Sequence, residues 1–131
     1  MPISIKRPNN GLAILTVVGK PTIEDILSTL NELYADTPPR NIIWDYRSGS
    51  AENFTQNDLR KIAYHVAKIA KLRPEGKTAF IAARDLDYGI GRMFASIAEL
   101  TEVKFPIKVF REFDEAMSWL NSLKTYSINT V

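Results

Sequence analysis

Short apolar runs alternate along the chain with segments in which apolar residues recur every three or four positions. The runs are rich in Ile, Val and Leu and are bounded by turn residues, which is typical of β-strands. The longer segments have the spacing of amphipathic helices with one apolar face. This pattern predicts strands at residues 3–7, 12–18, 41–45, 77–83 and 107–110, and helices at about 22–35, 55–73, 85–100 and 114–123.

Capping signals support the first two helices. Thr22 and Thr55 are each followed three residues later by an aspartate, Asp25 or Asp58, which is an acidic form of the capping box. Segments that contain proline follow both helices and are expected to end them, because proline lacks the N–H donor and disfavours helix in the residue before it. Between the first two strands, the sequence Pro-Asn-Asn-Gly predicts a tight hairpin.

The predicted order of elements is β-β-α-β-α-β-α-β-α. Strands that alternate with helices over so short a chain indicate parallel strands joined by right-handed crossovers, with helices covering the sheet. We therefore expect residues 1–131 to form one α/β domain with a mainly parallel sheet. The tail, residues 124–131, has no clear period and is expected either to be loose or to pair with a second copy of the chain in an oligomer.

Composition constrains the class of protein. The 131 residues are 45% hydrophobic and 24% charged, as in an ordinary soluble globular protein. No apolar run approaches the roughly 20 residues that span a bilayer, and the N-terminus lacks the apolar stretch of a secretory signal, so we expect a cytoplasmic protein without a transmembrane segment. Cysteine is absent, which excludes disulfides, thiol nucleophiles and cysteine-based zinc sites.

Basic residues are concentrated in one region. The net charge is only +2, which is small for a nucleic-acid-binding protein, but residues 55–84 carry seven Lys and Arg against two acids. On the second predicted helix, basic side chains lie opposite the apolar face. This face is interpreted either as a solvated surface or as a weak attachment to an anionic surface, lipid or nucleic acid. It consists of Arg60, Lys61, Lys68 and Lys71.

The loop after the third strand is a candidate site, because ligands bind beyond the carboxyl ends of strands in open parallel sheets. It contains Asp45 and Arg47, followed by Ser48 and Ser50. One hypothesis is a regulatory phosphoacceptor at Ser48 or Ser50, where new negative charge would meet amide donors and arginines. The alternative is a structural loop, in which Asp45 pairs with Arg47 and the serines satisfy loop amides.

The sequence suggests no catalytic or metal site. Its only histidine, His65, falls within the second predicted helix, where a lone imidazole supplies no metal set. Asp85 and Asp87 open the third helix, where acids stabilise the helix dipole. No nucleophile and base can be paired from these residues, so we expect a protein that is not an enzyme and carries no cofactor.

The segment YGIGRMF opens with Tyr88 and contains a G-x-G sequence. A dinucleotide fingerprint would need its third glycine where Phe94 stands, and this segment lies inside a predicted helix. Gly91 is expected to belong to a ridge of small residues that packs on the sheet. Arg92 beside that ridge is a candidate for a buried or cleft-lining cation.

Four segments together resemble a known family. At VVGKPTIEDILSTL, IIWDYR, DYGIGRMF and VFREFDEAMSWL, the chain resembles the SpoIIAA-like, or STAS (SEC14-like), family of small bacterial proteins. The resemblance implies a β-α superhelix with a mainly parallel sheet and a regulatory, non-enzymatic role. It also implies small apolar ligands, through the SEC14-related branch. Antagonist members carry a phosphorylated serine in an Asp-Ser-Ser-Gly-like motif at the start of the second helix, whereas this chain has Arg47-Ser48-Gly49-Ser50 ahead of a helix that starts at Thr55.

Two functions are therefore predicted. The first is a small regulatory or protein-binding module of the STAS type, whose partner is another protein. The alternative is a carrier or sensor that binds a small apolar, lipid-like or anionic ligand at the carboxyl ends of the strands, with Asp45, Arg47, Tyr88 and Arg92 as candidate binding residues. A closed apolar cavity between the sheet and the second and third helices would favour the alternative.

Overall fold

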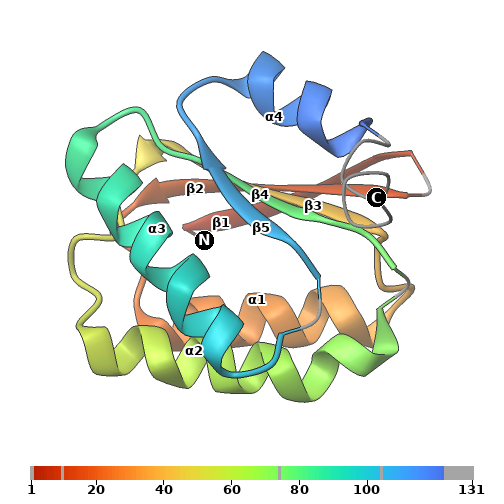
Figure 1. Ribbon diagram of the computed structural model, residues 1–131, viewed down its shortest axis with the longest axis horizontal. Coiled ribbons are helices and arrows are strands. Elements are labelled where there is room, and N and C mark those ends of the chain that lie inside the picture. The colour runs from red at the N-terminus through yellow and green to blue at the C-terminus, as the bar shows by residue number, and fades with distance from the viewer. Residues whose placement is uncertain (1, 10, 74, 104, 123–131) are drawn as a thin grey trace, which may run out of the picture.

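A five-stranded sheet with helices on both faces forms the centre of the molecule (Figure 1). The computed structural model describes residues 2–9, 11–73, 75–103 and 105–122. The strands are β1 (Ile3–Asn9), β2 (Leu12–Gly19), β3 (Asn41–Gly49), β4 (Thr78–Ile81) and β5 (Ile107–Phe110). The helices are α1 (Ile23–Ala35), α2 (Gln56–Ile69) with a 3₁₀ turn at Ala70–Leu72, α3 (Asp85–Leu100) and α4 (Phe113–Leu120).

The strands lie side by side in chain order, β1-β2-β3-β4-β5. β1 is antiparallel to β2, and the other neighbouring pairs are parallel. The prediction of a single α/β domain with an N-terminal hairpin and a mainly parallel sheet is therefore confirmed for the described residues.

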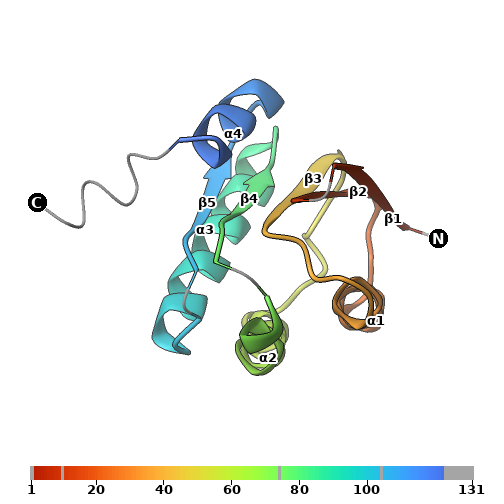
Figure 2. The same ribbon diagram turned by 90° about the vertical axis from the view of Figure 1, so that its right-hand side faces the viewer.

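Helices α1, α2 and α3 cover one face of the sheet, and α4 covers the other (Figures 1 and 2). Crossovers of one hand that always step in the same direction along a sheet place their helices on the same face. Side chains of β3 alternate between the two faces, so Ile42 and Trp44 belong to the core under α1–α3, whereas Ile43 belongs to the core under α4. We call these the three-helix face and the α4 face.

β3 is longer than the sequence predicted, because the apolar run indicated only 41–45. The pairing of β2 with β3 shifts register between Thr16 and Val18, where two residues of β3 lie opposite one of β2. Beyond this bulge, a Cβ at Gly49 would lie 2.7 Å from the Val17 carbonyl oxygen, so a glycine permits the close approach. Pairing with β2 thus extends the strand through residues that the sequence pattern assigned to a loop.

The predicted capping boxes are confirmed. Thr22 accepts from the Asp25 amide while Asp25 accepts from the Thr22 amide, and Thr55 and Asp58 make the same reciprocal pair. Helix α4 ends at Leu120, three residues before the predicted end, and its backbone is capped by the amide of the next residue. The tail at 124–131, with Tyr126, Ile128 and Val131, lies outside the described residues.

Candidate functional site

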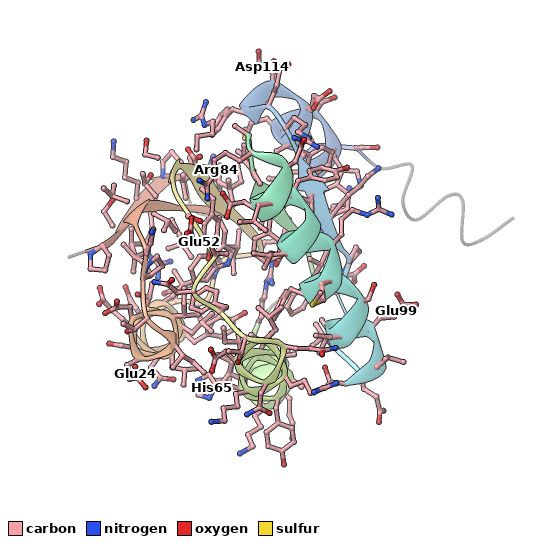
Figure 3. All side chains as sticks on the ribbon, turned by 90° about the vertical axis from the view of Figure 1, so that its left-hand side faces the viewer. Glu24, Glu52, His65, Arg84, Glu99 and Asp114 are labelled. Atoms are coloured by element: carbon pink, nitrogen blue, oxygen red, sulfur yellow. The ribbon has the colours of Figure 1, made fainter. Side chains whose placement is uncertain are left out.

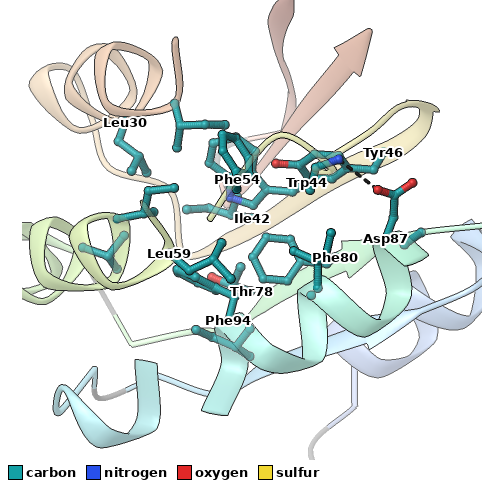
Figure 4. A pocket seen from close by; sticks show the side chains of 18 of the residues that line it. Leu30, Ile42, Trp44, Tyr46, Phe54, Leu59, Thr78, Phe80, Asp87 and Phe94 are labelled. Carbon is teal, nitrogen blue, oxygen red and sulfur yellow. Dashed lines mark hydrogen bonds between the residues drawn. The ribbon is translucent and has the colours of Figure 1, made fainter. Parts of the chain in front are cut away.

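A cavity lies between the sheet and the three helices of the three-helix face (Figure 4). The volume of the cavity that is open to the centre of a water molecule is about 70 Å³. A single water molecule needs about 10–15 Å³ of such volume, and few voids in native protein cores are larger than one water molecule. The floor consists of side chains from β3, from β4 and from the residue after β4: Ile42, Trp44, Tyr46, Thr78, Phe80 and Ala82.

Apolar side chains of the helices form the roof. They come from the faces that the helical spacing predicted to be buried, and they include Leu30 of α1, Leu59, Ile62 and Val66 of α2, and Ile90 and Phe94 of α3. Figure 4 shows the side chains of Leu30, Leu59 and Phe94 around the strand side chains Ile42 and Phe80. The Phe80 and Phe94 rings meet edge to face, with centroids 5.6 Å apart. Edge-to-face pairs of this kind stabilise the contact between α3 and β4.

Arg73 closes the end of the cavity at the amino ends of β3 and β4. The residue is only 8% exposed. Its Nε and Nη2 donate to the Arg40 carbonyl oxygen at 3.2 and 2.9 Å, Nη2 donates to the Lys77 carbonyl at 2.6 Å, and Nη1 donates to Thr78 Oγ1 at 2.7 Å. Its guanidinium lies 4.1 Å from the centre of the Phe105 ring. Burial lowers the pKa of Arg73, and the adjacent Tyr34 hydroxyl opposes that shift.

Asp87 lies at the opposite end of the cavity, beside Tyr46 (Figure 4). It is 4% exposed and accepts from Ser50 Oγ, from the Ala51 amide and from Arg84 Nε, each at 2.9 Å. Burial by itself raises the pKa of Asp87, but these hydrogen bonds and the Arg84 charge lower it below its ordinary value. Burial and the Asp87 charge raise the pKa of Tyr46, so its hydroxyl stays protonated.

The network of hydrogen bonds and ion pairs around Asp87 continues to the surface. Arg84 also donates to Ser50 Oγ at 2.5 Å and to Glu52 at 2.9 Å, and Lys20 pairs with Glu52 at 3.3 Å (Figure 3 labels Glu52 and Arg84). The hydrogen bonds from Arg84 lower the pKa of Glu52. This network ties the segment after β3 to the start of α3.

The predicted pair of Asp45 and Arg47 forms, but on the α4 face. Arg47 Nε and Nη2 donate to the two carboxylate oxygens of Asp45 at 3.0 and 2.8 Å, and the Arg47 amide donates to Oδ1 at 3.0 Å. The guanidinium lies 5.3 Å from the centre of the Phe113 ring, at the start of α4. Burial raises the pKa of Asp45, and the bonds from Arg47 outweigh it and lower the pKa.

Tyr88 and Arg92 lie elsewhere, on α3. Both line a groove between α3 and β5 that also contains Lys108 and Glu99. The Arg111 guanidinium lies 4.2 Å from the centre of the Tyr88 ring. The four predicted binding residues therefore do not surround one cleft, because β3 directs Asp45 and Arg47 to the α4 face while α3 covers the other.

The predicted phosphoacceptors differ in accessibility. Ser48 is exposed near the end of β3. Ser50 is 6% exposed, and its hydroxyl bonds Asp87 and Arg84 and accepts from the Glu52 amide at 3.1 Å. Phosphorylation of either residue stays a prediction, although Ser50 would first have to leave this network.

The basic side chains of α2 and of the 3₁₀ turn after it point to solvent. Arg60, Lys61, Lys68 and Lys71 are exposed, and Lys68 lies 4.7 Å from the centre of the Tyr64 ring. His65 on the same helix bonds Asn31 of α1 through Nε2 at 2.8 Å. Attachment of this surface to an anionic partner stays a prediction.

Sequence reasoning missed the residues that matter most for the cavity. The strict alternation of Ile42, Trp44 and Tyr46 was a usable signal, since it places all three side chains on one face of a strand. Arg73 gave no such signal, because its partners are backbone carbonyls brought in by β3 and β4.

Comparison with known proteins assigns the chain to no family. No model of a protein family matches the sequence, and no curated protein is significantly similar to it. Within residues 2–122, leaving out the undescribed positions, no three Asp, Glu or His side chains gather as metal ligands would. None of the helices described has the length and apolar character needed to cross a membrane.

Proposed function

We propose that the protein binds a small, mainly apolar molecule in the cavity of the three-helix face and acts as its carrier or sensor. The observation that carries this proposal is the cavity itself, which has room for several waters yet is lined almost wholly by aliphatic and aromatic side chains. Water is poorly held in such a space, because it needs two to four polar partners.

An apolar guest would stabilise the fold. Empty space removes dispersion contacts from the side chains around it, so filling the space restores them. Dry apolar cavities in other proteins bind molecules such as benzene. A ligand between β3, β4 and the three helices would contact most of the elements of the domain. Its binding should therefore raise the stability of the whole fold.

The alternative of a regulatory or protein-binding module, and the resemblance to the STAS-like family, remain predictions. Among the described residues, the segment where that family carries its phosphoserine is tied down by Asp87 and Arg84. We therefore favour the carrier or sensor.

Intrinsic fluorescence offers a direct test. The chain has two tryptophans, of which Trp44 lines the cavity and Trp119 lies on the α4 face. In a Trp119→Phe variant, titration with 1-octanol and with octanoate should change Trp44 emission in a saturable way, and bound ligand should raise the melting temperature. Native mass spectrometry of freshly purified protein would reveal a molecule that is already bound.

A matched pair of substitutions locates the binding. Val66→Phe places a ring in the cavity and should abolish both titrations, whereas Val18→Phe, at a residue that is 56% exposed, should leave them unchanged. If neither octanol nor octanoate binds and no molecule co-purifies, the proposed function is wrong.

A further inference from the structure

Among the residues that the structure describes, Arg73 is a buried positive charge at the cavity without an acidic partner. Arg73 lines the cavity, and among the described residues no carboxylate lies within 4.0 Å of its guanidinium; its acceptors are two backbone carbonyls and the Thr78 hydroxyl. By contrast, Asp87 at the other end is neutralised by Arg84 at 2.9 Å. An isolated buried charge is costly, so a cation in this position calls for an anion.

Two hydroxyl groups beside Arg73 can each donate a hydrogen bond to a ligand. Thr78 Oγ1 accepts from Arg73 Nη1 at 2.7 Å, and Tyr34 also lines the cavity, close enough that the Arg73 charge opposes the rise that burial causes in the pKa of Tyr34. Because a guanidinium only donates, Thr78 Oγ1 is the acceptor in this bond and keeps its own proton for another partner, and Tyr34 keeps its proton because burial raises its pKa. No described residue accepts from either hydroxyl, and both residues line the cavity. An oxyanion in the cavity would receive two hydroxyl protons next to a positive charge.

The length of the cavity and the charged residues at its two ends restrict which anion can bind. Its floor runs along β4 from Thr78 to Ala82, which is about 13 Å at the usual rise of a strand. Arg73 supplies a single positive charge at one end, and the carboxylate of Asp87 stands at the other. A ligand with one negative charge matches this arrangement, whereas a dianion or a molecule with a second carboxylate at its far end would bury an uncompensated charge.

We infer that the ligand is a monocarboxylic acid with an apolar body, whose carboxylate is received by the Thr78 and Tyr34 hydroxyls beside Arg73 and whose apolar body extends toward Phe94 and Tyr46. This inference rests on the proposed function and names the chemical class of its ligand. The carboxylate end fixes the orientation of the ligand, and the apolar remainder supplies contact with the walls.

Three probes of equal chain length separate the possibilities. We would titrate the Trp119→Phe protein with octanoate, 1-octanol and octanedioate at neutral pH and follow Trp44 emission. Octanoate should bind about tenfold or more tightly than 1-octanol, because hydrogen bonds to a charged group exceed those to a neutral one. Octanedioate should bind more weakly than octanoate, because its second carboxylate would be buried beside Asp87 without a positive charge to compensate it, since Arg84 already pairs with Asp87.

Removal of the two hydroxyls tests the position of the carboxylate. Truncating Arg73 risks unfolding, since it joins the carbonyls of Arg40 and Lys77. The double variant Tyr34→Phe/Thr78→Val keeps shape and charge and should lose most of the preference for octanoate while binding 1-octanol as before. Thr29→Val is the matched control, because Thr29 is buried in α1 with its hydroxyl bonded to the Asp25 carbonyl; it should keep the preference.

The outcomes distinguish this inference from the proposed function. Equal binding of octanoate and 1-octanol would overturn the inference and leave the proposed function standing. Failure of all three probes would overturn the inference, and it would overturn the proposed function as well if no molecule co-purifies. A double variant that retains the full preference for octanoate would show that the carboxylate lies elsewhere, which also overturns the inference.

Discussion

The two faces of the sheet are packed in different ways. On the α4 face, Ala79 of β4 and Ala116 of α4 are fully buried, and these small residues let the helix lie close to the strands. On the three-helix face, β3 and β4 present the large side chains Trp44, Tyr46 and Phe80, and a cavity lies between them and the three helices. One strand thus supplies a tightly packed core with one set of alternate residues and a binding cavity with the other.

The largest expected effects come from neighbouring residues of β3 that face opposite sides. Ile43→Ala on the α4 face should lower the free energy of unfolding by about 3–5 kcal/mol, because a filled core is left with a new hole. Ile42→Ala borders space that is already empty and should cost about 2–3 kcal/mol. Chemical denaturation measures both. A larger loss for Ile42→Ala would contradict the difference in packing.

Added volume should likewise destabilise the α4 face more than the three-helix face. Ala79→Val on the α4 face should destabilise by about 1–3 kcal/mol, because there is no room for two more methyl groups. Val66→Leu places one more methylene toward the cavity and should change the stability by less than about 0.5 kcal/mol, or increase it. Melting temperatures of the two variants provide the measurement, and equal destabilisation would mean that the cavity is not available for packing.

Each face also has one buried aspartate that is bonded to an arginine, and both should contribute to acid sensitivity. The pKa values of Asp45 and Asp87 are lowered in the folded state, so their stabilising contributions are present above the unfolded pKa of about 4 and are lost as the pH falls through the folded values. Asp45→Asn or Asp87→Asn should cost about 1–2 kcal/mol at pH 7. Unfolding measured from pH 7 down to pH 3 should fall less steeply for each variant than for the native protein, and parallel curves would contradict this.

The smallest effects concern the two serines after the bulge of β3. Ser50→Ala removes a buried hydroxyl that bonds Asp87 and Arg84 and should cost about 1 kcal/mol. Ser48→Ala changes an exposed residue and should stay within about 0.5 kcal/mol. Urea denaturation of the two variants distinguishes a structural hydroxyl from a free one, and an equal, negligible loss would show that the network around Asp87 does not depend on Ser50.

Local features of the sequence were enough to predict the elements and their order. The capping boxes at Thr22 and Thr55, the prolines after the first two helices and the apolar runs act within a few residues, so they are visible in the chain itself. Strand and helix order then restricts the topology to a parallel sheet with crossovers. The pairing of Asp45 with Arg47 was predictable for the same reason, since the two residues are only two positions apart.

Contacts between distant segments decided the rest. The extension of β3 to Gly49 depends on β2, and the position of Asp45 and Arg47 on the α4 face depends on which way the strand is turned. The cavity arises where three helices and two strands meet, and its charged end joins Tyr34 of α1 to Arg73 and Thr78. The sequence by itself therefore determined which segments are helices and strands, because those signals are local. Only the tertiary structure determined which side chains share a space, because that depends on the packing of elements far apart in the chain.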